Sequence, residues 1–323
     1  MKLTDITQKS TRKFSSFYKC LMAFCASILF GINSIYSQDL DPRAYVWVPV
    51  RGNFLVSGFS YSNGAVLTDP SLPLTNLKAE VQAISLGYAR SFNLLGKTAT
   101  AFAAIPYTWA QASADVNNQR EEATRSGFAD MRMRLVVLLL GAPATELANF
   151  GKVKHKPILG SSISISAPTG QFFSDKLINL GTNRLSFKPE LAYSHPFGKR
   201  WLMDVYSGVY FFTNNNSFYP GNSVRSQKPM GAFQGHLSYN LGPRSWVAFD
   251  ATFYTGGQSS VNDIYKDDRQ SNSRVGATFV FPAGKKHSIK IAASTGAIIR
   301  AGANFKTISV GWQTGWFKKP KKQ

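Results

Sequence analysis

The chain has 323 residues, with 37 lysines and arginines against 17 aspartates and glutamates and a formal net charge of +20. Aromatic residues make up 13% and charged residues only 17%, which excludes a disordered chain and a coiled coil. Beyond the N-terminal region, the longest apolar run is 135–142. That is far short of the roughly 20 residues that a membrane-spanning helix needs.

Residues 1–37 have the layout of a secretory signal peptide. Five lysines and arginines precede an apolar run from Cys20 to Ile32, and Ser37 is the expected cleavage point. A signal anchor is the alternative, although the run is short and no second one follows. Both cysteines lie in this segment, so the mature chain has none, which excludes disulfides, thiolate zinc sites and a cysteine nucleophile.

About twelve segments of the mature chain alternate apolar and polar residues with the period of a β-strand. In 127–140, for example, Met133 and Leu135 share one face, while Arg132 and Arg134 share the other. Alternation is weaker in 52–61 and 98–110, where small residues dominate one face. The predicted strands are 52–61, 80–92, 98–111, 127–140, 158–167, 185–195, 200–213, 229–240, 245–255, 273–282, 287–294 and 304–317.

The connections between these strands alternate in length. Tight turns are expected at 93–97, 196–199, 241–244 and 282–286, and the links between them are longer. One link breaks the rule, because 141–157 contains a helix-like stretch from Pro143 to Phe150. Short turns on one rim, long loops on the other and an even strand number are typical of a transmembrane antiparallel β-barrel. The alternative is a soluble β-sandwich or lipocalin-like barrel, which would turn its apolar face inward.

Aromatic residues gather near the predicted strand ends. Such clusters are typical of the interfacial girdles of membrane barrels, and ordinary packing at strand ends is the alternative. The clusters are Tyr45 and Trp47, Tyr107 and Trp109, Trp201, Phe211 and Phe212, Trp246, Trp312 and Trp316.

Three short patterns follow one another within 27 residues: 164–172 (SISAPTGQF), 179–184 (NLGTNR) and 187–190 (FKPE). Their order resembles the bacterial outer-membrane family named after the meta-pathway of phenol degradation, whose members are regarded as transporters. The segments 41–45, 127–132 and 140–144 resemble it too, so the similarity covers about 38–317. Two departures are Leu185, where the family often has tryptophan, and the residues that follow Phe317. The resemblance implies an outer-membrane β-barrel of a Gram-negative bacterium with a transport role, and it does not identify a substrate.

The motif block places 168–184 in a long loop at the outer rim. We predict that this loop constricts the mouth, with Arg184 pointing inward; a turn that only fixes strand register is an equal alternative. Glycines would allow unusual backbone angles, the proline would end a ladder, and the asparagines would bond within their own turns. The gating candidates are Pro168, Thr169, Gly170, Asn179, Gly181, Asn183 and Arg184.

Charged residues on the polar faces should line the lumen, because a charge facing lipid at mid-depth costs a few kcal/mol. A twelve-strand barrel lies between filled and open barrels, so two interpretations remain. One is a water-filled pore with weak selectivity, and the other is a web of salt bridges that fills a narrow lumen. The lumen candidates are Asp130, Arg132, Arg134, Lys188, Glu190, Asp204, His236, Asp250, Arg274 and Lys290.

The surplus positive charge is concentrated on the predicted periplasmic side, where Glu146 is the only acid. Such a rim would attract anionic lipid headgroups or an acidic periplasmic partner. We therefore expect outer-membrane lipids, the barrel-assembly machinery and a small-molecule solute as partners, and no nucleic acid. The basic residues of this rim are Lys97, Lys152, Lys154, Lys156, Lys199, Arg200, Arg244, Lys285, Lys286, Lys318, Lys319, Lys321 and Lys322.

No pattern of an enzyme is present in the sequence. It has no Gly-x-Ser-x-Gly elbow, no His-Glu-x-x-His zinc motif, no phosphate loop and no dinucleotide fingerprint. His236 is expected in the lumen rather than in catalysis, and no cofactor or metal is expected. The sequence therefore predicts a signal peptide (1–37), an outer-membrane β-barrel (38–317) and a basic tail (318–323). Its expected function is the passive or facilitated passage of small solutes, and the family label suggests hydrophobic or aromatic ones. A plugged, non-conducting barrel whose loops bind a partner is the alternative.

Overall fold

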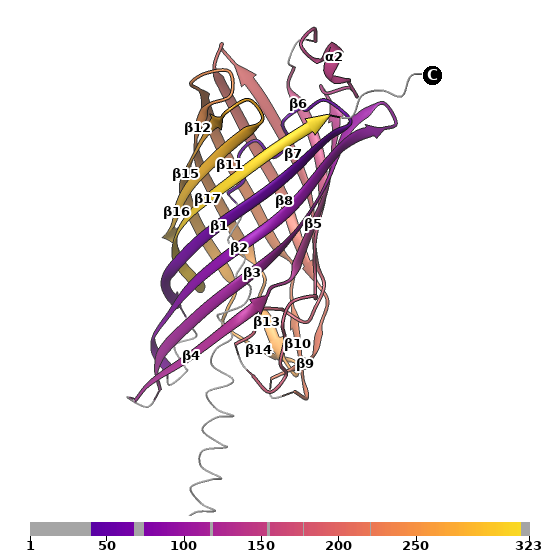
Figure 1. The fold of residues 1–323 in the computed structure, drawn as a ribbon. Coiled ribbons are helices and arrows are strands. Elements are labelled where there is room, and N and C mark those ends of the chain that lie inside the picture. Colours follow the sequence, from indigo (N-terminus) through magenta and orange to yellow (C-terminus); the bar gives the residue numbers. More distant parts are fainter. Residues whose placement is uncertain are drawn as a thin grey trace, which may run out of the picture.

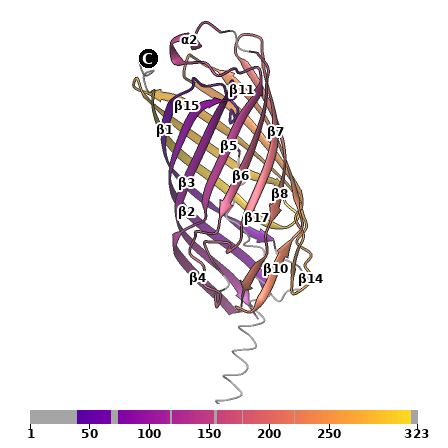
Figure 2. The ribbon, with the colours of Figure 1, turned by 90° about the vertical axis from the view of Figure 1, so that its right-hand side faces the viewer.

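The computed structural model describes residues 40–67, 74–116, 119–153, 156–176, 178–219 and 221–317. The predicted signal peptide at 1–37 and the basic tail at 318–323 lie outside these residues. Twelve strands form one antiparallel barrel (Figure 1), and the pairing of β2 with both β1 and β3 closes the ring. Seen from the side, the barrel is a long cylinder of strongly tilted strands (Figure 2).

The barrel strands are β1 (Gly52–Leu67), β2 (Leu74–Leu94), β3 (Lys97–Val116), β5 (Met131–Leu140), β6 (Ile158–Ala167), β7 (Ser186–Phe197), β8 (Trp201–Phe212), β11 (Met230–Asn240), β12 (Trp246–Gly256), β15 (Gln270–Ala283), β16 (His287–Ile298) and β17 (Gly302–Phe317). A further strand, β4 (Gln119–Phe128), pairs with β3. Four short strands form a separate sheet in two long loops: β9 (Asn215–Phe218), β10 (Ser223–Gln227), β13 (Ser259–Val261) and β14 (Ile264–Tyr265).

The barrel has two unlike ends (Figure 1). At the short-turn end, where β1 begins and β17 ends, the links are tight except for 141–157. That link carries the helix α2 (Leu147–Phe150), which is shorter than the predicted helix-like stretch. The long-loop end carries β4 and the four-stranded sheet, which the sequence had predicted as loop. Each of the twelve predicted strands overlaps one of the twelve barrel strands. Within the described residues, no helix is long and apolar enough to cross a membrane.

The barrel wall is apolar on the outside and polar on the inside. On β7, Leu191 is 58% exposed, while Glu190 beside it is 4% exposed, and this alternation continues through the strand. Phe249 on β12 likewise points outward, and Asp250 is completely buried. This arrangement is the reverse of a soluble barrel and matches a wall that faces lipid. The soluble interpretation is therefore wrong.

The polarity of the two faces inverts near the long-loop end of β2. Outward residues are apolar from Ile84 to Tyr88, but Glu80 and Gln82 on the same face are polar. Inward residues change in the opposite sense, because Val81 is buried and apolar. The same inversion occurs on β3 beyond Trp109. The strands therefore leave the apolar belt at this level and continue as a rim with an apolar interior and a polar exterior.

The predicted strand 127–140 is broken into β4 and β5, which corrects that prediction. Tyr107 pairs with Phe128, and Ala104 pairs with Arg132, so two residues of β3 face three residues of the partner strand. One of the two is Pro106, which has no N–H to donate to the ladder. The extra residue makes a β-bulge, a feature that can redirect a side chain.

Candidate functional site

The N-terminal segment 40–51 lies inside the lumen at the short-turn end. Asp41 is its deepest ionic contact, with its carboxylate 3.2 Å from Lys290 Nζ and 3.5 Å from Arg134 Nη1. Burial acts to raise the pKa of Asp41, but these two cations hold it below its usual value. The segment then runs toward α2, where the Trp47 indole donates to the carbonyl of Pro143 at 3.1 Å.

This placement corrects the interpretation of Tyr45 and Trp47 as girdle residues, since both are buried inside the barrel. The Tyr45 ring packs edge-on against Tyr206, with centroids 4.9 Å apart. Phe212 also points inward, and Trp246 lies under the Arg43 guanidinium at 4.5 Å. Trp109, Trp201 and Trp316, by contrast, are exposed on the outer surface, as predicted.

A buried ionic triad joins three of the predicted lumen residues. Glu190 accepts from Arg134 Nη2 at 2.8 Å and from Lys188 Nζ at 2.7 Å. The side chains of Lys188 and Glu190 are almost fully buried. The Tyr45 hydroxyl donates to the same carboxylate at 2.9 Å. Burial raises the pKa of Tyr45 to about 12, so the phenol keeps its proton at physiological pH.

A second polar cluster spans five neighbouring strands, from β7 to β15. His236 Nδ1 lies 2.7 Å from Asp250 Oδ1, and Thr278 donates to the other oxygen of Asp250 at 2.8 Å. Asp204, directly opposite His236 across the ladder, accepts from Ser194 and from the backbone N–H of Arg43. These groups therefore contact one another, the barrel wall and the N-terminal segment.

At the long-loop end, the bulge aims Asp130 into the loop 168–184. Its carboxylate accepts from the N–H of Gly170 at 3.0 Å and from the N–H and hydroxyl of Thr182 at 2.9 and 2.6 Å. Thr169 accepts from the N–H of Met131 at 2.9 Å. Asp130 was predicted to face the lumen; it lines the outer cavity, and its carboxylate also anchors the loop.

The other candidates of this loop have specific contacts. β6 ends directly before Pro168, and Asn179 bonds within its own turn, to Phe173 and Lys176. Asn183 instead donates to Asn215 of the next loop at 2.9 Å, so its expected bond was wrong. Arg184 is buried over the ring of Phe212, 4.6 Å from its centroid, and donates to Gln227.

Gly170 and Gly181 are required by close packing and not by unusual backbone angles, since neither has a positive φ. A Cβ at Gly170 would lie 2.7 Å from the backbone nitrogen of Asp130, and one at Gly181 would lie 2.7 Å from the carbonyl carbon of Gly170. The loop therefore lies directly on the bulge, and a methyl group at either position would separate the two.

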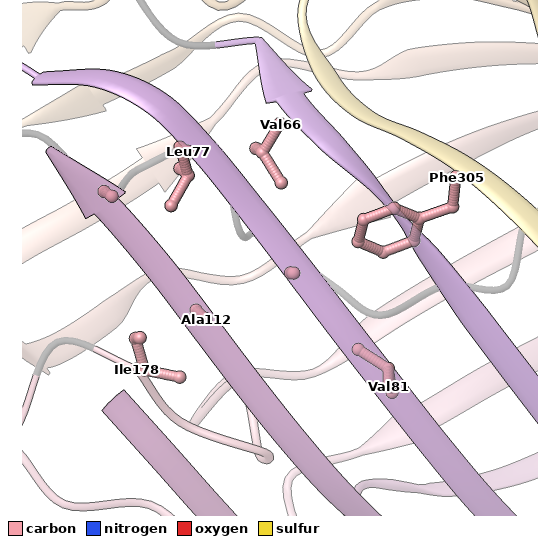
Figure 3. Packing of buried hydrophobic residues seen from close by; sticks show 8 residues of the cluster. Val66, Leu77, Val81, Ala112, Ile178 and Phe305 are labelled. Carbon is pink, nitrogen blue, oxygen red and sulfur yellow. The ribbon is translucent and has the colours of Figure 1, made fainter. Parts of the chain in front are cut away.

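The tip of this loop belongs to an apolar cluster on the inner face of the rim (Figure 3). Ile178 lies on the loop, Leu77 and Val81 lie on β2, and Phe305 faces them from β17. Arg125 on β4 holds the loop by donating to the carbonyl of Ile178 at 3.1 Å. The loop is thus packed onto the inner face of the rim, where Val81 and Leu180 also line a cavity.

Three adjoining cavities run along the lumen. The outer cavity, of about 350 Å³, lies against the small residues of β1, β2, β3 and β17, such as Gly58, Ser60 and Ala83. A middle cavity of about 170 Å³ shares Arg132 with it. A cavity of about 1070 Å³ at the short-turn end shares Arg134 with the middle one. The weakly alternating strands thus form the open side of the lumen.

The predicted lumen residues divide between the two sides of the barrel. Lys188, Glu190, Asp204, His236 and Asp250 are buried in polar contacts along β7 to β12. Arg274 is buried too, donating to the carbonyl of Phe305 at 2.8 Å. Arg132, Arg134 and Lys290 line the cavities. In the part of the chain that the structure describes, no group of three His, Cys, Asp or Glu residues could hold a metal ion.

We expect Gly170→Ala to displace the loop 168–184 from the bulge, because the added methyl group has no room against the Asp130 backbone. Limited proteolysis of the barrel in liposomes should then cut the loop several-fold faster than in the wild type. Gly235→Ala on β11 is the matched control, since its Cβ would meet nothing within 4 Å. Equal cutting rates in both variants and the wild type would contradict the anchoring role.

Comparison with known proteins places this architecture among outer-membrane barrels. A family model described as "Putative MetA-pathway of phenol degradation" matches residues 57–314. An outer membrane channel from Pseudomonas putida F1 superposes with a TM-score of 0.73 at 19% identity, over 86% of this chain and 100% of that one. The transport unit of the autotransporter AIDA-I from Escherichia coli gives 0.51 at 9% identity, over 93% and 99%. No curated protein matches the sequence.

Proposed function

The chain belongs to the family described as "Putative MetA-pathway of phenol degradation", and from this premise we propose that it is a passive channel of the Gram-negative outer membrane for small hydrophobic or aromatic solutes. Its fold is that of an outer-membrane β-barrel. In such barrels the short turns face the periplasm and the long loops face outward. The short-turn end is accordingly assigned to the periplasm.

The observation that carries the proposal is the series of adjoining cavities. They extend from the apolar outer mouth, past Arg132 and Lys290, to the large cavity at the periplasmic end. The smallest of them by volume lies beside Arg134 and Asp41, where the N-terminal segment crosses the lumen. A small solute could follow the side of the barrel that is lined by glycine, serine and alanine.

The apolar cluster at the mouth supports a hydrophobic or aromatic solute. Val81 of this cluster and Leu180 of the loop line the outer cavity, at the level where a solute would enter. Transfer of apolar surface onto such a wall is favourable by about 25 cal/mol per Å². Sugars and ions gain nothing from this wall, so it favours apolar solutes over hydrophilic ones of equal size.

The proposal is tested with the mature chain in liposomes. We expect discrete single-channel steps in a planar bilayer, and faster entry of phenol or toluene into liposomes that contain the barrel than into empty ones. A folded and inserted barrel that shows neither would favour the second candidate, a plugged barrel whose loops bind a partner. The filled side of the lumen is the observation that favours that candidate.

We expect Lys290→Glu to shift ion selectivity toward cations, because Lys290 lines both the outer and the periplasmic cavity. The reversal potential in a KCl gradient measures this shift, and it should move toward the equilibrium potential of potassium. Lys306→Glu is the matched control, since Lys306 is exposed on the outward face of β17. A shift of equal size in both variants would assign the effect to general surface charge.

The outward apolar belt is proposed to contact outer-membrane lipids, and the basic rim to contact their anionic headgroups or an acidic periplasmic partner. Trp201 and Trp316 lie on the outer surface of the short-turn end, at the level expected for the periplasmic interface. Insertion by the barrel-assembly machinery remains part of the proposal. A non-enzymatic role is proposed as well, because the polar clusters of the lumen form contacts within the wall and with the N-terminal segment.

A further inference from the structure

The cavity at the periplasmic end has a combination of charge and apolar surface that a plain solute path does not require. Six cationic residues line it, and Asp41 is the only carboxylate among its lining residues. Between the cations, its walls are carbon-rich, with Val46, Phe54, Val56 and Val280 among them. Its volume of about 1070 Å³ is at the upper end of the range of small-molecule sites.

The cations at the mouth of this cavity are not neutralised by the described residues. Arg244 is held by the carbonyls of Gly284, Lys285 and His287 at 2.8, 2.9 and 2.7 Å, which fixes its guanidinium but leaves its charge. Lys285 and Lys286 follow on the adjacent turn, exposed and without an ion pair to a described residue. A concave surface lined by one sign of charge concentrates ions of the opposite sign.

Arg43 adds a fourth cation deeper in the same cavity. Its Nη2 donates to Asn240 at 2.8 Å and its guanidinium stacks on Trp246, but Nε is buried without a partner. Lys290 and Arg134, at the floor, are already paired with Asp41. The free positive charge therefore lies at the mouth and upper wall, and the apolar wall lies between it and the floor.

We propose that this cavity binds an amphipathic organic anion. The acidic group would lie at Arg244, Lys285 and Lys286, and the alkyl or aryl part would pack against Val56, Phe102 and Val280. Charge-assisted hydrogen bonds hold the head, and burial of apolar surface holds the tail. The inference deepens the proposed function by naming a substrate class, and it rests on that function only for the direction of passage.

The test is equilibrium binding of octanoate to the mature chain in nanodiscs of zwitterionic lipid, measured by calorimetry against empty nanodiscs. Octanol and octylammonium are the matched probes, with the same chain and a neutral or positive head. We expect octanoate to bind at least about tenfold more tightly than octanol, and octylammonium not to bind. Equal affinities for all three would overturn the proposal.

Two variants within the cavity and one control outside it assign the binding to this cavity. Lys285→Gln/Lys286→Gln should weaken octanoate binding about tenfold and leave octanol binding unchanged. Lys152→Gln/Lys156→Gln removes the same charge from the same rim outside the cavity and should change neither. Val46 is 40% exposed in the cavity wall, and Val46→Asp should weaken the binding of both octanoate and octanol. Unchanged octanoate binding in the lysine variant, with a heat-modifiable barrel band showing that it is folded, would also overturn the proposal.

The source of the anion is distinguished by lipid composition. If the headgroups of anionic phospholipids occupy the cavity, phosphatidylglycerol in the nanodisc should compete with octanoate; if a free organic acid is the ligand, it should not. Binding does not require conduction, so the two proposals fail separately. A non-conducting barrel that binds octanoate would contradict only the proposed channel function. A conducting barrel that does not bind octanoate would contradict only the proposed anion site.

Discussion

Removing residues 40–49 from the mature chain should raise the single-channel conductance of the barrel several-fold. These residues cross the lumen from Asp41, beside Lys290, to Trp47, beside α2, and they separate the middle cavity from the periplasmic one. The smallest of the three cavities lies directly beside this segment, so we expect the segment to limit the conductance. Without it, Glu190 and Asp204 would face a water-filled lumen, so the wall has no reason to collapse.

The comparison uses bilayer recordings of the shortened and the full mature chain at the same salt concentration. Val46→Ala is the control, because this side chain has no polar contact and its loss leaves the segment in place. An unchanged conductance in a folded, shortened barrel would mean that ions pass along the open side of β1 to β3 and around the segment. The buried polar contacts along β7 to β12 would then be the part of the lumen that limits the conductance.

The barrel wall could be predicted from the sequence because one physical rule acts along every strand within the lipid. In 274–281, polar and apolar residues alternate, and the apolar set that includes Ala277 and Phe279 faces lipid. The rule fails where the strands leave the bilayer. On β2 the inward residues change from Ser85 to Val81, so the strand was predicted to begin six residues too late. A search for outward apolar residues alone therefore fails where the outer face of a strand passes from lipid into water.

The interior of the barrel depends on contacts between distant parts of the chain. The inward face of Arg134 and Glu190 could be predicted from alternation, but their pairing requires two strands that are 56 residues apart. Asp41 and Lys290 are 249 residues apart, and Asp41 lies in a segment with no periodicity at all. Tyr45 and Trp47 were misassigned for the same reason. An aromatic residue before the first strand is equally compatible with an interfacial girdle and with a segment inside the lumen.

The bulge at Asp130 gives a predicted lumen residue an additional contact that alternation alone does not indicate. Its parity within 127–140 points it inward, as expected for a lumen charge. The proline opposite it removes one ladder hydrogen bond, and the extra residue that results turns the carboxylate toward three donors of the loop. The signal for this was Pro106 within an otherwise regular strand, which argues for a bulge.

Glu190→Leu should lower the free energy of unfolding of the barrel by about 3–5 kcal/mol, the cost of leaving buried charges without their partner. The substitution removes the acceptor of Arg134, Lys188 and Tyr45 at once. Urea unfolding in liposomes, followed by tryptophan fluorescence, measures the loss. Glu122→Leu on the exposed face of β4 is the same change without a buried partner, and it should fall within about 0.5 kcal/mol of the wild type.

A second variant separates the ionic web from simple packing. Lys188→Met/Glu190→Leu removes one cation together with the carboxylate, and Arg134 keeps its contact with Asp41. Replacing a buried pair by apolar residues of similar volume is often neutral, so the double variant should be more stable than Glu190→Leu alone. If both variants lose the same stability, the triad acts through its shape and not through its charge. In that case the filled side of the lumen would tolerate neutral residues, and the charges there would have to be explained by the passing solute.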